Sequence, residues 1–189
     1  HAGKSPEMGI NAILEIAHKI IEAQQLANEP LGTTINTGFV NGGRSPYIVP
    51  ASACARIVSR VWTLDEKKRI EKGMKALEDT HFVKGTKIKV HGNFHRQPLI
   101  QLPQAGLLIE SVSLAAAAIG VDINFAGSGA ASDGNNLTGL GIPTIDGMGP
   151  VGGREHSPDE YLELETLFER TLLLAVTMLF IEQKFGHVA

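Results

Sequence analysis

Apolar and polar positions follow two different periods along the first half of the chain. In two stretches apolar side chains recur every three to four positions, as on an amphipathic helix, and the first stretch opens with a cap, a proline and an acid at Ser5-Pro6-Glu7. In other stretches they alternate, as where Lys89 separates Ile88 from Val90, which is typical of a half-buried strand. The elements predicted here are helices over 5–27 and 65–77 and strands over 33–40, 47–62 and 86–94. This order indicates an antiparallel sheet with its helices on one face.

The pattern becomes more apolar in the second half. An alanine-rich helix is predicted over 103–119, short apolar strands over 121–125 and 142–145, and a long final helix over 161–184. Helices that alternate with strands indicate a parallel α/β layer. We therefore predict an α/β protein of two parts, residues 1–100 and residues 101–189.

The composition is that of an ordinary globular protein. Hydrophobic residues make up 43% and charged residues 20%, and the net charge of −3 comes without a lysine or arginine cluster, so we expect no nucleic-acid partner. No apolar stretch reaches the roughly 18 residues of a membrane span, so we expect no membrane partner. The single cysteine, Cys54, excludes an internal disulfide framework and favours a cytoplasmic location.

His156 is the first candidate for chemistry. It follows a glycine-rich turn, 149–153, which lets the backbone pass close to a ligand, and its ring is well placed to bind a metal. The alternative is an ordinary surface histidine, with Ser157-Pro158-Asp159-Glu160 as a plain helix cap. The residues alone leave both interpretations open.

Residues 127–135 form a small polar loop at the end of a predicted strand. Its backbone N–H groups suit a bound anion such as a carboxylate, and the alternative is a tight turn capped by Asp133. No lysine follows its glycines, so it is not a phosphate loop. Arg60, at the end of a predicted strand, is either a surface charge or a fork for a substrate carboxylate.

Four segments, taken together, resemble one family. They are His1-Ala2-Gly3 with Gly9-Ile10-Asn11-Ala12, Asn41-Gly42-Gly43 with Ile48-Val49-Pro50-Ala51, the loop 128–135, and the block from Gly141-Ile142-Pro143 to His156-Ser157-Pro158. In this order they are similar to the motifs of the di-zinc metallopeptidases that include glutamate carboxypeptidases, acetylornithine deacetylases, succinyl-diaminopimelate desuccinylases and aminoacylases. The resemblance implies a ferredoxin-like α+β lid, without its first strand, over 1–100, and the C-terminal part of a zinc-peptidase α/β catalytic domain over 101–189.

The same resemblance implies roles for individual residues. His156 corresponds to a zinc ligand, and His1 to a lid histidine that stabilises the tetrahedral oxyanion, often in the partner subunit's active site. Arg60 corresponds to the arginine that holds the substrate carboxylate, and Ala131 and Ser132 to a loop that contacts substrate through its backbone. The implied cofactor is a pair of zinc ions in the complete protein, with cobalt or manganese as alternatives.

Some positions depart from the family pattern. Tyr47 stands where the family usually has asparagine, Val58 where an acid is common, and Ala130 where a loop glycine is usual. The family's remaining metal ligands and its general base all precede the point at which this chain begins. We therefore expect this chain alone to be inactive and to bind zinc weakly.

The implied function is that of a zinc-dependent hydrolase. It would cleave an amide bond of a small peptide or an N-acyl amino acid that carries a free carboxylate. The glycine-rich context of His156 favours a glutamate-carboxypeptidase-like enzyme. The alternatives are a deacylase of the same family and a non-catalytic dimerisation module, and in each case we expect a homodimer through the lid.

Overall fold

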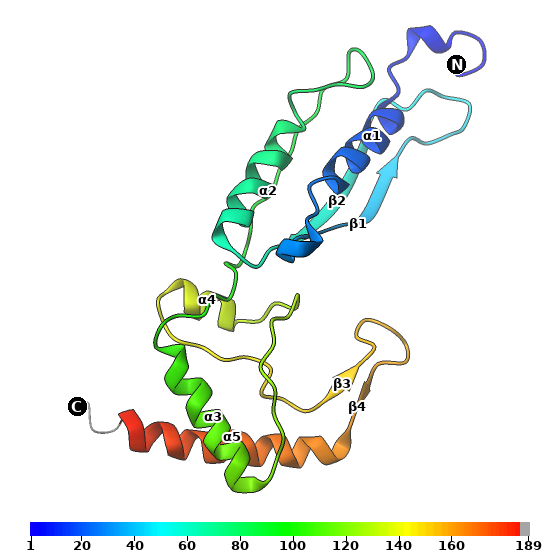
Figure 1. The fold of residues 1–189 in the computed structure, drawn as a ribbon. Helices are drawn as coiled ribbons and strands as arrows, with labels where there is room; N and C mark the ends of the chain where they lie inside the picture. The colour runs from blue at the N-terminus through cyan, green and yellow to red at the C-terminus, as the bar shows by residue number, and fades with distance from the viewer. Residues whose placement is uncertain (186–189) are drawn as a thin grey trace. The chain divides into compact units, whose positions relative to one another are not determined.

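The computed structural model describes residues 1–185, which form two compact units, residues 1–98 and the residues from 99 onward (Figure 1). Residues 186–189, which end the second predicted part, lie outside the described residues. Each unit contains helices and an antiparallel pair of strands.

The first unit is built on an antiparallel hairpin of β1 (Thr34–Gly42) and β2 (Ala53–Arg60). Thr34 pairs with Arg60 at one end and Gly42 pairs with Ala53 at the other, and the register shifts at Gly38. Side chains of β2 alternate between half-buried and exposed, as in a sheet that is covered on one face. The exposed side chains of β2 are Cys54, Arg56, Val58 and Arg60.

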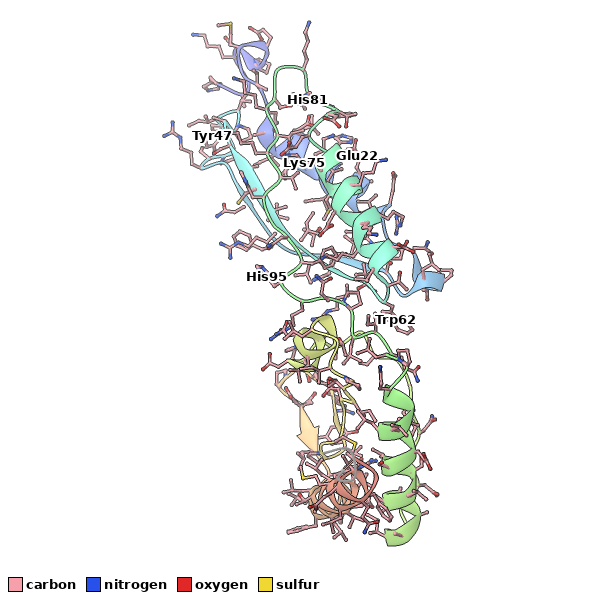
Figure 2. The ribbon with its side chains drawn as sticks, turned by 90° about the vertical axis from the view of Figure 1, so that its left-hand side faces the viewer. Glu22, Tyr47, Trp62, Lys75, His81 and His95 are labelled. Carbon is pink, nitrogen blue, oxygen red and sulfur yellow. The ribbon has the colours of Figure 1, made fainter. Side chains whose placement is uncertain are left out.

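Two helices, α1 (Ala12–Gln24) and α2 (Leu64–Ala76), lie on the same side of this hairpin (Figure 2). Each begins at a side-chain cap. Asn11 Oδ1 accepts a hydrogen bond from the N–H of Leu14 at 3.0 Å, and Thr63 Oγ1 accepts one from the N–H of Glu66 at 3.2 Å. A 3₁₀ turn, η2 (Glu29–Leu31), leads from α1 to β1. The buried apolar side chains of this unit include Ala23, Ile35 and Ile70.

The first helix begins later than predicted. Residues Pro6–Met8 form one 3₁₀ turn, η1, Ser5 provides no side-chain cap, and Gly9 is extended with φ −110° and ψ 153°. A Cβ on Gly9 would lie 2.6 Å from the Cβ of Val49, so the backbone passes too close for a larger residue. Because the chain is extended here, the helix starts only at Ala12, and it ends at Gln24 rather than at 27.

The strand predicted over 47–62 is shorter in the structure. Before Ala53 two backbone carbonyls accept hydrogen bonds from the N-terminal segment. The carbonyl of Tyr47 accepts from the N–H of Ala2 at 2.9 Å, and the carbonyl of Pro50 accepts from the N–H of Ala12 at 3.0 Å. Residues 43–52 therefore form the loop of the hairpin, since these carbonyls bond outside the strand ladder.

Residues 86–94 keep the predicted alternation but do not form a strand. Ile88 and Val90 are half-buried, as predicted, and the lysines between and before them are exposed. Within the described residues no strand pairs with this segment, and the N–H of Val90 donates to the carboxylate of Glu78 at 2.6 Å. The alternation sets which side chains face inward, whereas a strand also requires a hydrogen-bonded neighbour.

The second unit consists mainly of two long helices that pack against each other, α3 (Ala105–Ile119) and α5 (Leu164–Phe185) (Figure 1). A short helix, α4 (Gly134–Gly139), and an antiparallel pair, β3 (Gly152–Gly153) and β4 (Tyr161–Leu162), lie between them in the chain. The buried residues of the α3–α5 contact are Val112, Ala115, Ala116 and Leu173.

The strands predicted over 121–125 and 142–145 do not form within the part of the chain that the structure describes. Ile123 and Ile145 nevertheless pack against the α3–α5 core, because burying apolar side chains needs no strand partner. The final helix was predicted from 161 but begins at Leu164, after β4. No helix of the described residues is both long enough and apolar enough to cross a membrane.

Candidate functional site

His156 lies in the loop that joins β3 to β4, and its backbone is left-handed. The φ angle is +66° at His156 and +59° at Arg154, a region that costs a residue with a side chain about 1 kcal/mol or more. The Glu160 carboxylate accepts a hydrogen bond from the His156 N–H at 3.2 Å, and the Ser157 hydroxyl donates to the Arg154 carbonyl at 2.7 Å. These bonds hold the loop in a shape that leaves His156 exposed.

Residues 157–160 form a turn, so the interpretation of this segment as the cap of the final helix is wrong. The Ser157 Oγ accepts from the N–H of Asp159 at 3.2 Å, and β4 intervenes before α5 begins at Leu164. In the first turn of α5, Thr166 Oγ1 instead accepts from the N–H of Val151 at 2.8 Å. This bond ties the glycine-rich segment to the helix.

The described residues do not form a metal centre by themselves. No three His, Cys, Asp or Glu side chains among them come close enough to hold an ion. A zinc site in a protein needs three or four such ligands. A hollow of about 610 Å³ beside the glycine-rich segment is lined by Glu155, Glu160 and Arg170. His156 is a single exposed candidate, and its role as a zinc ligand stays a prediction.

Ala131 and Ser132 precede α4, in the loop predicted to bind an anion or to turn tightly. Ser132 Oγ accepts from the N–H of Gly134 at 3.1 Å, and Asn135 Oδ1 accepts from the N–H of Ser132 at 2.9 Å. Asp133 occupies the predicted N-cap position of α4, but its side chain makes no cap hydrogen bond to the helix. The loop uses these donors internally, which favours the tight turn, and its contact with substrate stays a prediction.

His1 folds back on its own backbone. Its Nδ1 accepts hydrogen bonds from the N–H groups of Gly3 and Lys4, both at 3.2 Å. Ala2 donates to the carbonyl of Tyr47, which keeps His1 beside the hairpin loop where Figure 2 labels Tyr47. Because Nδ1 is an acceptor, the hydrogen-bond network assigns the ring proton to Nε2, which can then donate to an oxyanion.

Arg60 lies at the opposite end of the hairpin from His1. It occupies the last position of β2, opposite Thr34, with its side chain in the exposed row. The strand from Ala53 to Arg60 is about 23 Å long at about 3.3 Å per residue. Within the first unit the structure therefore separates the two predicted residues by the length of the hairpin.

A buried carboxylate holds the Arg60 end of the hairpin to α2. Glu66 accepts hydrogen bonds from the Arg69 guanidinium, at 2.7 Å from both Nε and Nη2, and from the hydroxyl of Thr33, which precedes β1. Arg69 also donates to the Leu26 carbonyl at 2.8 Å. The hydrogen bonds from Arg69, followed by that from Thr33, lower the pKa of Glu66 from 4.5 to about 2.

Arg56 is a residue that sequence analysis missed. Its guanidinium carbon lies 5.1 Å from the ring centroid of Phe39, in the exposed row that ends at Arg60. The register pairs Thr37 with Ile57 and Phe39 with Arg56, because Gly38 is passed over. Without that shift Gly38 would face Arg56, so no sequence pattern alone signals the contact.

The first unit is similar to a known family of domains. Residues 1–86 match the profile of the M20-type peptidase dimerisation domain. The hairpin and its two helices lie within the matched residues, so the first unit is similar to a peptidase dimerisation domain. This match confirms the resemblance to the metallopeptidase family that the four motifs indicated, and it confirms the α/β fold class.

Solved peptidase structures share the fold. The aminopeptidase PepT from Bacillus cereus ATCC 10987 is 24% identical, with a TM-score of 0.61 over 94% of this chain and 47% of PepT. A tripeptidase from Staphylococcus aureus subsp. aureus Mu50 is 25% identical, with a TM-score of 0.62 over 96% of this chain and 47% of the tripeptidase. YxeP of Bacillus subtilis, a dinuclear metal-binding peptidase from the M20 family, is 18% identical, with a TM-score of 0.54 over 91% of this chain and 46% of YxeP.

One curated relative is the uncharacterized protein YqjE of Bacillus subtilis (strain 168). It is 31% identical over 171 residues, which are 88% of this chain and 44% of YqjE. The chain therefore spans about half the length of the relatives it matches.

Proposed function

We propose that the protein containing this chain is a metal-dependent peptidase that hydrolyses short peptides. The observation that carries the proposal is the match of residues 1–86 to a peptidase dimerisation domain. The likeness to a tripeptidase at 25% identity supports it, because that likeness extends over 96% of the chain and so includes the second unit. The chain would contribute the dimerisation unit and part of the catalytic unit.

Arg60 and His1 have separate roles in this proposal. The exposed guanidinium of Arg60 offers two parallel donors to the free carboxylate of a substrate. The Nε2–H of His1 donates to the oxyanion that develops when the amide carbonyl is attacked. Because the hairpin separates the two residues, one copy cannot aim both at one small substrate through the first unit alone. His1 of each copy is therefore proposed to act in the partner's site.

His156 is the metal ligand proposed from this chain. Its exposed position in a glycine-rich loop supports that role. The other ligands of a dinuclear centre would come from outside the described residues, among which no ligand cluster forms. Zinc is the metal proposed, with cobalt or manganese as alternatives. The backbone of Ala131 and Ser132 is proposed to contact the substrate.

The proposed dimer forms through the first unit. Among the described residues β1 pairs with β2 along one edge, so the backbone groups of its other edge remain available for a second copy. A groove of about 480 Å³ beside that strand is lined by Ile20, Ile21, Asn36 and Thr37. Ile21 is 58% exposed, and a second copy would bury it.

Two classes of substrate are compatible with the proposed function. Removal of a C-terminal glutamate, as in a glutamate-carboxypeptidase-like enzyme, and release of an acyl group from an N-acyl amino acid both need a free carboxylate on Arg60. The peptidase is the leading candidate, because the family match is to a peptidase domain. The deacylase is the second candidate.

The test uses the metal-loaded protein that contains this chain. We expect it to hydrolyse di- and tripeptides with a free C-terminus and to lose activity with a chelator, and we expect light scattering to give the mass of a dimer. Arg60→Gln should raise KM about tenfold or more with a smaller change in kcat, because it removes a charged hydrogen bond. Lys68→Gln is the control, since Lys68 is an exposed cation on α2.

Two outcomes would contradict the proposal. If neither peptides nor N-acyl amino acids are hydrolysed by the metal-loaded protein, it is not an amide hydrolase. If peptides with amidated C-termini are cleaved as well as free ones, and Arg60→Gln changes nothing, Arg60 does not hold the carboxylate.

A further inference from the structure

The face of the hairpin opposite the helices carries a row of side chains with a distinct charge pattern. The cross-strand pairs on this face include Arg56 with Phe39, Val58 with Asn36, and Arg60 with Thr34. None of these side chains is acidic, and two are guanidinium groups. The face is therefore cationic in a chain whose net charge is −3.

Arg56 is held in place within this row. Its guanidinium carbon lies 5.1 Å from the centroid of the Phe39 ring, a geometry that favours the cation electrostatically. A guanidinium stacked on an aromatic ring keeps its N–H donors at its edge, so they can still bind a planar anion. The stacking also limits the conformations of Arg56, so less conformational entropy is lost when an anion binds.

Val58 lies between the two arginines and adds no charge. It is 54% exposed, so an apolar side chain faces solvent at the centre of the row. An acid at this position would lie about 7 Å along the strand from each arginine, at about 3.3 Å per residue, and would neutralise both. With valine there, no acid at position 58 competes with a ligand for Arg56.

We propose that Arg56 is a second anion-binding residue of the substrate surface and selects short peptides that carry an acidic side chain. This inference rests on the proposed function, in which Arg60 holds the terminal carboxylate. Arg56 and Arg60 are four positions apart on β2, which is about 13 Å between their Cα atoms. An extended peptide advances about 3.4 Å per residue. Its acidic side chain would therefore lie about four residues before the C-terminus, with Val58 beneath the residues between.

The test compares matched peptides that differ only by glutamate or glutamine at that upstream position. The metal-loaded protein is expected to prefer the glutamate peptide in kcat/KM, through a lower KM. Arg56→Gln should reduce this preference about tenfold, the effect of losing one charged hydrogen bond. Arg56→Lys should keep part of it, and Phe39→Leu should weaken it without affecting the glutamine peptide.

Val58→Asp and Lys68→Gln complete the set. Val58→Asp should lower the preference as Arg56→Gln does, because the aspartate neutralises the row. Lys68→Gln should leave the preference unchanged, because Lys68 is an exposed cation on α2. Raising the salt concentration should reduce the preference in the unsubstituted protein, because the contact is exposed.

The outcomes separate this inference from the proposed function. If peptides are hydrolysed but the preference is absent, or is unchanged in Arg56→Gln, the role of Arg56 is refuted and the peptidase stands. If no peptide is hydrolysed, the peptidase is refuted, and calorimetric binding of the same peptides decides about Arg56. Tighter binding of the glutamate peptide that is lost in Arg56→Gln supports the inference, and equal binding refutes it.

Discussion

Glu66 shows how one carboxylate joins two parts of the first unit. Its oxygens accept hydrogen bonds from Arg69 on the same helix and from Thr33 at the entry to β1, and its pKa is about 2 instead of 4.5. A carboxyl group with a lowered pKa in the folded state stabilises the fold at pH values above its unfolded pKa. That contribution is lost as the pH falls from about 4.5 towards 2.

We predict that Glu66→Gln makes the stability of the chain less dependent on acid pH. At pH 7 the urea midpoint should fall, because a neutral amide pairs less well with Arg69. Between pH 4.5 and pH 2 the midpoint should fall less in the variant than in the unsubstituted chain. It should still fall in both proteins, because both keep the lowered carboxyl pKa values of Glu15 and Glu78. Glu71→Gln on the same helix is the control, and equal pH profiles for all three proteins would contradict the prediction.

Residue roles could be predicted from the sequence only where near neighbours decide them. The glycine-rich turn before His156 identified a candidate ligand, whereas the left-handed backbone of His156, in the loop between β3 and β4, is visible only in the structure. Arg69 lies three residues from Glu66, a spacing visible in the sequence, but Thr33 is 33 residues away. Contacts between distant residues depend on the fold, and no single-residue pattern signals them.

Helix α1 holds the segment after α2 through buried charges. Glu15 accepts hydrogen bonds from the N–H groups of Val83 and Phe82, and Lys19 donates to Thr80 and to Glu22, both at 2.7 Å. Both charged side chains on this helix face are only 3% exposed. Burial alone would raise the pKa of Glu15, but the hydrogen bonds from Val83 and Phe82 and the charge of Lys19 lower it.

We predict that Glu15→Gln frees the segment 80–86 while α1 and α2 stay folded. The amide hydrogens of Phe82 and Val83 should exchange about tenfold faster or more, because a charged acceptor is lost. Hydrogen exchange measured by NMR at each residue checks this. Glu22→Gln is the control on the same helix, since its partner Lys19 keeps Thr80. A uniform rise in exchange across the unit would mean global destabilisation instead.

The predicted helices and the strand over 33–40 form, whereas three predicted strands do not form within the described residues. The spacing of apolar residues placed α2 and α3 within one or two residues of their observed bounds. A helix satisfies its own backbone, so local pattern is sufficient. The segments 86–94, 121–125 and 142–145 have strand-like patterns, but a strand depends on a neighbour that local pattern does not reveal.

At the scale of the molecule, the second unit leaves much apolar surface uncovered. Leu173 is fully buried against α3, whereas its neighbour Leu172 is 52% exposed and Phe168 is 76% exposed. A helix that is apolar on nearly every side is normally buried within a larger structure. The family relatives are about twice as long, which fits a unit that packs against further protein.

We predict that the chain by itself self-associates through α5. Leu172→Glu should reduce self-association in light scattering and leave the melting temperature nearly unchanged, because the side chain is exposed. Leu173→Ala, one residue along, should instead lower the stability by about 2–5 kcal/mol. If Leu172→Glu unfolds the chain, or leaves its self-association unchanged, α5 does not provide the surface through which the chain self-associates.

The family could be identified from motifs spread over the whole chain, but the geometry of the site could not. Motifs report residue type and order, and they suggested that His1 and Arg60 belong to one reaction. The structure puts these residues at the two ends of the hairpin, so their cooperation requires either a second copy or a different pairing of sites. Sequence order contains no information about that distance.

The length of the hairpin therefore sets the distance between Arg60 and His1, the two residues proposed to act on the substrate. Adding two residues to each strand would keep every side chain on its present face and move the Tyr47 end about 7 Å further from Arg60, at about 3.3 Å per residue. Adding a single residue to β2 would turn Arg56 and Val58 towards the helices. Length changes in this hairpin should consequently be tolerated in even steps, and each step would change the distance between Arg60 and the histidine proposed to act in the partner's site.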